Sequence, residues 1–359
     1  MTAPLALHLL NVGQGEAILI DLPDGSFMLL DGGPMADATV IVDAIEERLK
    51  AKRRFRLAGI SQWDKDHIQG IPAILARFSP EEFRYPGVDL HLFEEIAQRE
   101  ANEELSKLTR EVRASIEALP ETAQQHFIAH SLLDDLGGVE VHVLSPSPNV
   151  TAQIRHDLER SRAAGSALLK QFRNRTSVAL WIRFAGRTLF LAGEAEADQY
   201  LGMEAYFLRN HGALLPHRHK HAADWIKLSH HGADENNPDD LFKFFGAPSF
   251  VGAASSGGGY NHPHPAALKR LHFDHGGSAM CTGLGKGCHA ILTAKKKSKL
   301  DPSQPDLWAK NISEHTNPHL DCYGHITVTV TPDGRCSTST TDAQKACPYG
   351  GPASGKRTW

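Results

Sequence analysis

The chain is poor in cysteine, has no large excess of charge of either sign, and shows no internal repeat. All five cysteines lie in the last quarter of the 359 residues, and an odd number fits poorly with a closed disulfide framework, so we expect reduced thiols. The 38 basic and 42 acidic side chains give a formal net charge of -4. We therefore do not expect a protein that coats nucleic acid or membrane through bulk charge, and any binding of a polyanion must be local.

The first twenty residues also lack a basic cluster, an uninterrupted apolar segment and a cleavage-site pattern. A membrane helix needs about 20 consecutive apolar residues, and a secretory signal needs the other two features. We therefore expect no membrane association and a cytoplasmic protein.

Apolar side chains make up 41% of the chain, which is enough for a large core. Short alternating or apolar runs predict strands at 5–12, 16–22, 26–33, 56–61, 138–146, 176–184, 187–194, 225–229, 249–255 and 324–334. Helical spacing predicts helices between many of them, beginning with residues 38–52. This alternation favours an α/β (α+β) fold in which two sheets pack face to face with helices outside, a four-layer αββα sandwich.

We predict a main domain over residues 1–290 with a helical insert at about 78–171. Apolar residues from Phe93 to Leu119 recur at threes and fours among charges, which predicts one long amphipathic helix. This helix offers a surface for a protein partner. Residues 291–359 are expected to complete a sheet and to end in a flexible tail.

Ligand-type side chains follow several of the predicted strands. The stretch "SQWDKDHIQG", residues 61–70, contains Asp64, Asp66 and His67 directly after a buried strand. Carboxylates bunched at a strand end repel one another unless a cation lies between them. Capping of the next helix would explain Asp66 alone, so we favour a divalent metal ion at this position.

Three further strand ends carry residues of the same kind. Glu194 ends the strand at 187–194, and His230 and His231 follow the strand at 225–229. His262 and His264 follow the strand at 249–255. Glu194 is either a ligand, an outer carboxylate or the start of a helix, and His262 is the better ligand candidate of its pair.

Five pieces of the sequence, in this order, resemble the metallo-β-lactamase superfamily, and within it the soluble hydrolase domain of ComEC-type DNA-uptake proteins. They are "NVGQGEAILIDLPDGSFMLLDGG", "SQWDKDHIQG", "NRTSVALWIRFAGRTLFLAGEAE", "WIKLSHHGA" and "YNHPHPAAL". The resemblance implies the metallo-β-lactamase sandwich, a one- or two-metal site, and hydrolysis, in this branch usually of phosphodiesters in nucleic acid.

The resemblance also implies which residues hold the metal. The signature His-x-Asp-x-Asp-His of the family falls on residues 62–67, with Gln62 in place of the first histidine. The bridging aspartate of the family becomes Glu194, and the "HHG" and "HP" motifs supply His230, His231 and His262. The metal ligands expected in this way are Gln62, Asp64, Asp66, His67, Glu194, His230 and His231.

The expected ligand set is rich in oxygen, which moves the preference from Zn²⁺ toward Mn²⁺ or Mg²⁺, and we favour Mn²⁺. Our mechanistic hypothesis has the metal generate a hydroxide at neutral pH while Asp66 orients the attacking water. His231 or His262 would stabilise the leaving oxygen. The catalytic residues expected are therefore Asp66, His231 and His262.

We expect a metal-dependent phosphodiesterase, most simply a nuclease with DNA or RNA as the substrate. Two alternatives stay open at this point. The changes at Gln62 and Glu194 favour a weakened or inactive member that binds a partner within a multi-component, for example antiviral, system. The near-neutral net charge favours a cyclic-nucleotide phosphodiesterase.

Two weaker clusters lie toward the end of the chain. Cys281, Cys288 and Cys322, with histidines nearby, are a candidate structural zinc site, although the spacing is wider than in a zinc knuckle. The basic run from Lys295 to Lys299 is a candidate for phosphate contact, but runs of this kind are usually solvated surfaces.

Overall fold

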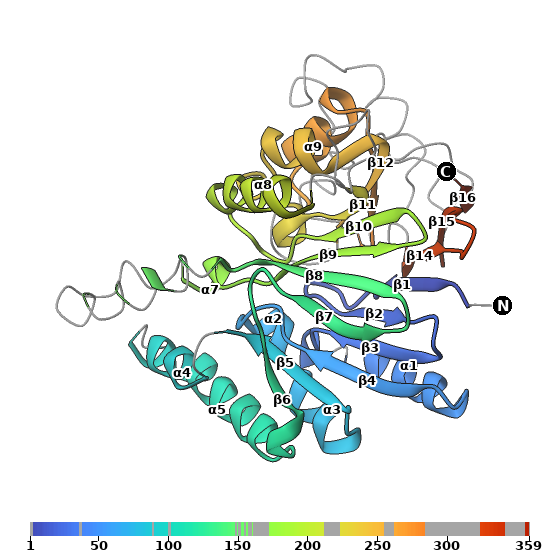
Figure 1. The fold of residues 1–359 in the computed structure, drawn as a ribbon. Coiled ribbons are helices and arrows are strands. Elements are labelled where there is room, and N and C mark those ends of the chain that lie inside the picture. The colour runs from blue at the N-terminus through green and yellow to red at the C-terminus, as the bar shows by residue number, and fades with distance from the viewer. Residues whose placement is uncertain are drawn as a thin grey trace, which may run out of the picture.

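The computed structural model describes residues 3–35, 38–87, 90–99, 102–147, 149, 152–153, 156, 160, 172–211, 223–254, 262–283, 324–341 and 356–358. Within these residues the strands form two sheets (Figure 1). In spatial order, the first sheet consists of β16 (Lys356–Thr358), β15 (Cys336–Thr340), β14 (Ile326–Val330), β1 (Leu5–Leu9), β2 (Ile18–Asp21), β3 (Ser26–Leu30), β4 (Arg54–Gly59), β5 (Glu82–Pro86) and β6 (Gln124–Phe127). The second consists of β13 (Ser278–Cys281), β12 (Gly246–Ala254), β11 (Ala223–Lys227), β10 (Arg187–Leu191), β9 (Ala179–Phe184), β8 (Val139–Ser145) and β7 (Leu132–Leu136).

The two sheets pack against each other through apolar side chains. In β1, "LALHL", and in β14, "ITVTV", every second side chain is buried, as expected for strands with one face in the core. The core between the sheets joins Leu7 of β1 and Met28 of β3 to Val141 of β8, Ile182 of β9 and Trp225 of β11. Such a core holds the sheets face to face.

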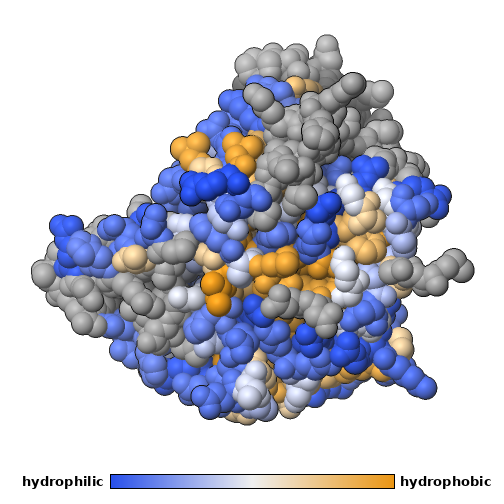
Figure 2. Space-filling view, in the orientation of Figure 1, coloured by the Kyte–Doolittle hydropathy of each residue, from blue (hydrophilic) through white to orange (hydrophobic). Residues whose placement is uncertain are grey.

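Helices cover the outer face of each sheet. On the first sheet, α1 (Ala38–Lys50), α3 (Ile71–Arg77) and α5 (Glu103–Glu117) pack in a cluster with β3 and β4. On the second sheet, α8 (Ala197–His211), α9 (Asp239–Phe245) and α10 (Pro265–Lys269) pack in a separate cluster with β9 to β11. The predicted four-layer αββα sandwich is confirmed (Figure 1). In Figure 2 the apolar side chains on the visible face gather near the middle of the view, over strands of the two sheets.

The stretch predicted as one long helix is two helices, so that prediction is wrong. Helix α4 spans Leu90–Arg99 and is followed by α5. Asn102 stands between them as the N-cap of α5, because its side chain accepts a hydrogen bond from the backbone N–H of Leu105 at 3.0 Å. The stretch 78–171 also contains β5 to β8, which belong to the two sheets, and most of 148–171 lies outside the described residues.

The C-terminal part returns to the first sheet. Strand β14 pairs antiparallel with β1, and β15 pairs with β14. Cys288, Cys322 and the run Lys295–Lys299 lie outside the described residues, and Cys281 is buried in β13. Among the described helices, none combines the length and the apolar character that a membrane span requires.

Candidate metal centre

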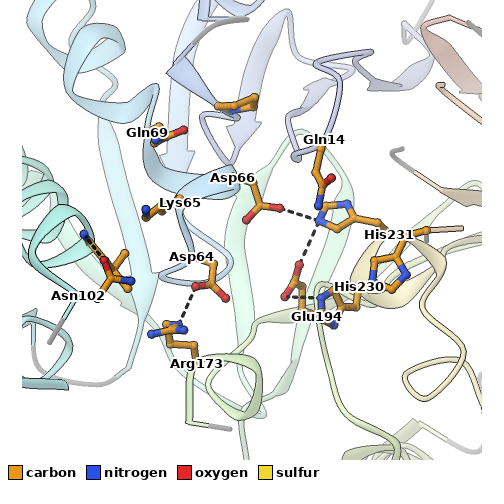
Figure 3. A pocket seen from close by; sticks show the side chains of 13 residues that line it. Gln14, Asp64, Lys65, Asp66, Gln69, Asn102, Arg173, Glu194, His230 and His231 are labelled. Atoms are coloured by element: carbon orange, nitrogen blue, oxygen red, sulfur yellow. Dashed lines mark hydrogen bonds and ion pairs between the residues drawn. The ribbon is translucent and has the colours of Figure 1, made fainter. Parts of the chain in front are cut away.

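The candidate site lies where strand ends from both sheets meet. Strands β3 and β4 are parallel neighbours in the first sheet, and β10, β11 and β12 are parallel neighbours in the second. The carboxyl ends of parallel neighbours lie at the same edge of a sheet, and the loops that follow these strands open onto one pocket of about 410 Å³ (Figure 3). Its lining consists of Gln14, Pro34, Asp64, Lys65, Asp66, Gln69, Asn102, Leu105, Arg173, Glu194, His230, His231 and His262.

Four side chains with metal-ligand chemistry converge here, three of them in the pocket lining and His67 buried beside them. One donor atom from each of Asp66, His67, Glu194 and His231 lies within 4.8 Å of the others. His67 Nε2 is 3.0 Å from Glu194 Oε1, and His231 Nε2 is 2.9 Å from Asp66 Oδ2 and 3.2 Å from Glu194 Oε1. Two imidazoles and two carboxylates form a donor set that suits a divalent ion.

Asp31, which follows β3, orients His67. Its buried carboxylate accepts hydrogen bonds from the backbone N–H and the hydroxyl of Ser61, both at 2.6 Å, and lies 2.9 Å from His67 Nδ1. The backbone N–H of Gly32 donates to the carbonyl of His67 at 2.7 Å, which ties the two loops together. Because a carboxylate only accepts, it places the imidazole proton on Nδ1 and leaves Nε2 facing Glu194.

His230 and His231 lie in a short 3₁₀ turn, Ser229–Gly232, that is conformationally strained. Both have left-handed backbone angles, with φ of 46° and 52°. Non-glycine residues in this region cost on the order of 1–3 kcal/mol each and gather at functional sites. The side chain of Asn237 holds the turn through hydrogen bonds with the N–H of Ser229 at 3.0 Å and the carbonyls of Ser229 and Ala233 at 2.8 and 2.6 Å.

Glu194 is positioned by the tight turn after β10. Gly193 has φ of 56°, and a Cβ at that position would lie 2.4 Å from the carbonyl of Val178, so only glycine fits. The N–H of Glu194 donates to the hydroxyl of Ser177 at 2.7 Å. The Oε2 atom of Glu194 is buried and has no hydrogen-bond partner among the described residues. A buried carboxylate oxygen in this state is costly unless a cation binds it, so the residues fit a metal ion.

The charges of these groups are strongly coupled. Burial alone would lower the pKa of His231, but hydrogen bonds and charges from Asp66 and Glu194 raise it to about 9. Burial likewise opposes a rise in the pKa of His67, and Asp31 together with Glu194 raises it well above its usual value. Without a metal, protons on the two imidazoles therefore neutralise the carboxylates, and a bound ion would take over that role.

A second buried ion pair lies behind the centre. Glu16 and Lys227 are both fully buried and form an ion pair, and Lys227 Nζ also donates to the carbonyl of Gly193 at 3.1 Å. Burial raises the pKa of Glu16, while the charge of Lys227 lowers it. Lys227 therefore supports the turn that carries Glu194.

The other predicted ligands lie outside the group of four. Asp64 lines the pocket but pairs with Arg173, whose Nε is 2.7 Å from Asp64 Oδ1. Burial raises the pKa of Asp64 to about 6, against the charge of Arg173. Gln62 is fully buried, is absent from the pocket lining, and has no hydrogen-bond partner for either side-chain polar atom among the described residues.

His230 and His262 line the pocket next to the group of four. Their ring centroids are 5.3 Å apart, and His230 Nε2 is 3.9 Å from Glu194 Oε2. His264 instead caps α10, because its ring nitrogen accepts a hydrogen bond from the N–H of Ala266 at 3.2 Å. Sequence reasoning did not single out Asp31 or Arg173. The signal for Asp31 was its place at a strand end before two glycines, whereas nothing in the pattern indicated Arg173.

No family model and no curated protein sequence matches this chain. Among solved structures, it is similar to a metallo-β-lactamase from Staphylococcus aureus subsp. aureus COL, with 11% identity and a TM-score of 0.35 over 58% of this chain and 52% of that one. It is also similar to Zn²⁺-bound PqqB from Methylobacterium extorquens, with 14% identity and a TM-score of 0.31 over 60% of this chain and 59% of that one.

MEM-A1, a subclass B3 metallo-β-lactamase from a soil metagenome library, is similar with 11% identity and a TM-score of 0.37 over 68% of this chain and 81% of that one. The match thus spans about half of the Staphylococcus aureus protein and more of the other two. Values this low define neither an activity nor a metal for this chain, and the resemblance to ComEC-type hydrolase domains stays a prediction.

Proposed function

We propose that this protein is a metal-dependent hydrolase that cleaves phosphodiester bonds in nucleic acid. The observation that carries the proposal is the convergence of donor atoms from Asp66, His67, Glu194 and His231 within 4.8 Å of one another, with three of these residues in the lining of a pocket. The imidazole of His67 is oriented, the turn that carries His231 is strained, and Glu194 Oε2 is buried without a hydrogen bond among the described residues. Such features in one place are costly unless they serve a ligand.

The walls of the pocket support a phosphate-bearing substrate. Lys65 and Arg173 bring positive charge to the pocket lining, and Gln14, Gln69 and Asn102 bring amides that can hydrogen-bond phosphate oxygens and bases. Asn102 belongs to the start of α5, and the ion pair between Lys65 and Glu104 ties that helix to the metal-site loop. The α4–α5 insertion thus forms one wall and contributes to substrate selection.

A divalent ion held by the four residues would activate water and stabilise charge that develops on phosphoryl oxygens. Asp31 keeps the His67 proton on Nδ1, so that Nε2 stays available as a ligand. Asp66 would use its second oxygen to orient the attacking water. His262, which lines the pocket outside the group of four, would donate a proton to the leaving oxygen. Two nitrogen and two oxygen donors suit Mn²⁺ or Zn²⁺ better than Mg²⁺, and Mn²⁺ is our first choice.

The test is hydrolysis of end-labelled single-stranded DNA, duplex DNA, RNA and a cyclic dinucleotide in Mn²⁺, Zn²⁺ or Mg²⁺. We expect cleavage of at least one linear nucleic acid, with Asp66→Asn reducing the rate by about 10²-fold or more. Asp224→Asn is the matched control. Asp224 accepts a hydrogen bond from Thr188 N–H at 2.9 Å at the start of β11, the end of the strand away from His230 and His231, and this variant should keep its rate.

Cleavage that survives Asp66→Asn would overturn the site assignment. Turnover of the cyclic dinucleotide alone would replace the nucleic-acid substrate with a cyclic nucleotide. A folded protein that binds metal but cleaves none of the four substrates would overturn the proposed reaction.

A further inference from the structure

Asp64 belongs to the same loop as the metal-binding residues, yet it is held by a cation of the protein itself. Its carboxylate lies close enough to Asp66 and Glu194 that their charges raise its pKa. Arg173, from α7 (Phe172–Arg175), forms the ion pair with it at 2.7 Å, and only 15% of the Arg173 side chain is exposed (Figure 3). The guanidinium therefore stands at the edge of the carboxylate cluster, on the side away from His231.

The residues on the Asp64 side do not make a second set of metal ligands. Neither Asp64 nor His230 belongs to the group whose donor atoms lie within 4.8 Å of one another. Gln62, the other ligand-type residue of this loop, is fully buried as His67 is, and its neutral amide is a weaker metal ligand than an imidazole. The described residues therefore do not give a second ion at this position the three or more protein ligands that a tightly bound divalent metal usually needs.

The charges lead to the same conclusion. Three carboxylates line the pocket, those of Asp64, Asp66 and Glu194. The charge of Lys65, also in the lining, is offset by its ion pair with Glu104 outside the lining. One divalent ion and the Arg173 guanidinium then balance the three carboxylates, whereas two divalent ions beside the guanidinium would exceed their charge. Arginine keeps its charge at every physiological pH, so it is a permanent substitute for an ion.

We propose that Arg173 takes the place of a second metal ion in this pocket. The protein binds one divalent ion, at Asp66, His67, Glu194 and His231, and Asp64 holds the guanidinium beside it as the second positive charge. The planar fork of arginine matches phosphate oxygens, so this charge binds the phosphate of the substrate next to the ion. The phosphate contact rests on the proposed function, but the number of ions does not.

The decisive measurement is the number of ions per chain after saturation with Mn²⁺ and removal of excess, by elemental analysis and by electron paramagnetic resonance. We expect about one Mn²⁺ per folded wild-type chain, without the spin coupling of two ions about 3.5–4 Å apart. The double variant Arg173→Met with Gln62→His removes the cation and restores an imidazole, so we expect about two coupled ions. Arg175→Met is the matched control on the same helix, because Arg175 faces Asp198 and does not line the pocket, and it should keep one ion.

Two coupled ions in the wild type, or one ion in a folded double variant, would overturn the proposal. Circular dichroism verifies that each variant is folded. If the double variant does not fold, the single variant Arg173→Gln replaces it in the test. One ion per chain of Arg173→Gln at saturating Mn²⁺ would then refute the proposal. A wild type that binds no metal would instead refute the proposed function. If hydrolysis is found, Arg173→Lys should raise KM more than it lowers kcat, and an unchanged KM would refute the phosphate contact.

Discussion

Replacing Asp31 with asparagine tests whether a residue that does not touch the metal controls its binding. The carboxylate of Asp31 accepts hydrogen bonds from the backbone and hydroxyl of Ser61 and lies 2.9 Å from His67 Nδ1. An asparagine has nearly the same shape, but one of its two ends becomes an N–H donor. If the Ser61 N–H keeps the oxygen, the amide N–H faces the hydroxyl and His67 Nδ1.

A donor opposite Nδ1 makes that nitrogen the acceptor and moves the imidazole proton to Nε2. The Nε2 atom points toward Glu194 at 3.0 Å and is the nitrogen that the metal needs. Loss of such an orienting partner typically costs 10- to 100-fold in metal affinity, which is about 1.4–2.7 kcal/mol. We therefore expect Asp31→Asn to weaken Mn²⁺ and Zn²⁺ binding by that factor.

The assay is calorimetric titration of metal-free protein with Mn²⁺, or competition with a chelator for Zn²⁺, with melting curves in EDTA to separate affinity from folding. Asp224→Asn is the control, because Asp224 also accepts backbone and side-chain hydrogen bonds, partly buried, but lies at the far end of β11. It should lose stability at most. A folded Asp31→Asn protein with wild-type affinity would refute the tautomer argument, and equal losses in both variants would show a general structural effect.

Two further predictions concern the turn that carries His231. Asn237→Ala removes three hydrogen bonds that hold this turn, so the free energy of unfolding in urea should fall by about 2–4 kcal/mol and metal binding should weaken. Unchanged values would show that the turn keeps its conformation without Asn237. The pKa of His231 is raised to about 9 in the folded protein, against about 6.5 in the unfolded chain, so protonated His231 stabilises the metal-free protein fully below pH 6.5 and no longer does so once the pH reaches about 9. Between these pH values the free energy of unfolding of the metal-free protein should fall while metal affinity rises. A flat profile in both titrations would contradict the charge coupling.

Local patterns in the sequence were sufficient for most of the fold. Alternation in β1 and β14 and apolar spacing in α1 follow from which side chains must be buried, and both are visible without tertiary information. The apolar spacing gave a wrong prediction where a helix boundary lies inside a stretch with continuous helical periodicity. Helix α4 ends at Arg99 and Asn102 caps the start of α5, although the apolar spacing continues across this boundary. Strand β6, "QQHF", is mostly polar and sits at the edge of its sheet, so alternation gave no sign of it.

The site was predictable to the extent that strand ends determine it. Asp66, His67, Glu194 and His231 each follow a strand whose carboxyl end reaches the same edge, and the structure brings them together. The contacts between side chains from different loops depend on the distances between those loops, and no local sequence pattern encodes these distances. The pairing of Asp64 with Arg173 joins positions more than a hundred residues apart, and residue spacing alone could not distinguish a ligand from an ion pair.

Several features of the pocket that the sequence did not reveal make it costly to fold. The left-handed angles at His230 and His231 destabilise the folded chain, and so does Glu194 Oε2, which has no hydrogen bond among the described residues. Packing around the pocket offsets them, since Asn237 fixes the turn and Lys227 is bonded to the carbonyl of Gly193, next to Glu194. A cost of this kind persists in a folded protein when the arrangement serves a ligand, and an ion bound between Glu194 and the imidazoles would satisfy the open oxygen and replace the protons on the histidines. The cluster is therefore better explained as an ion-binding centre than as a network of hydrogen bonds, whose groups would be satisfied with less strain.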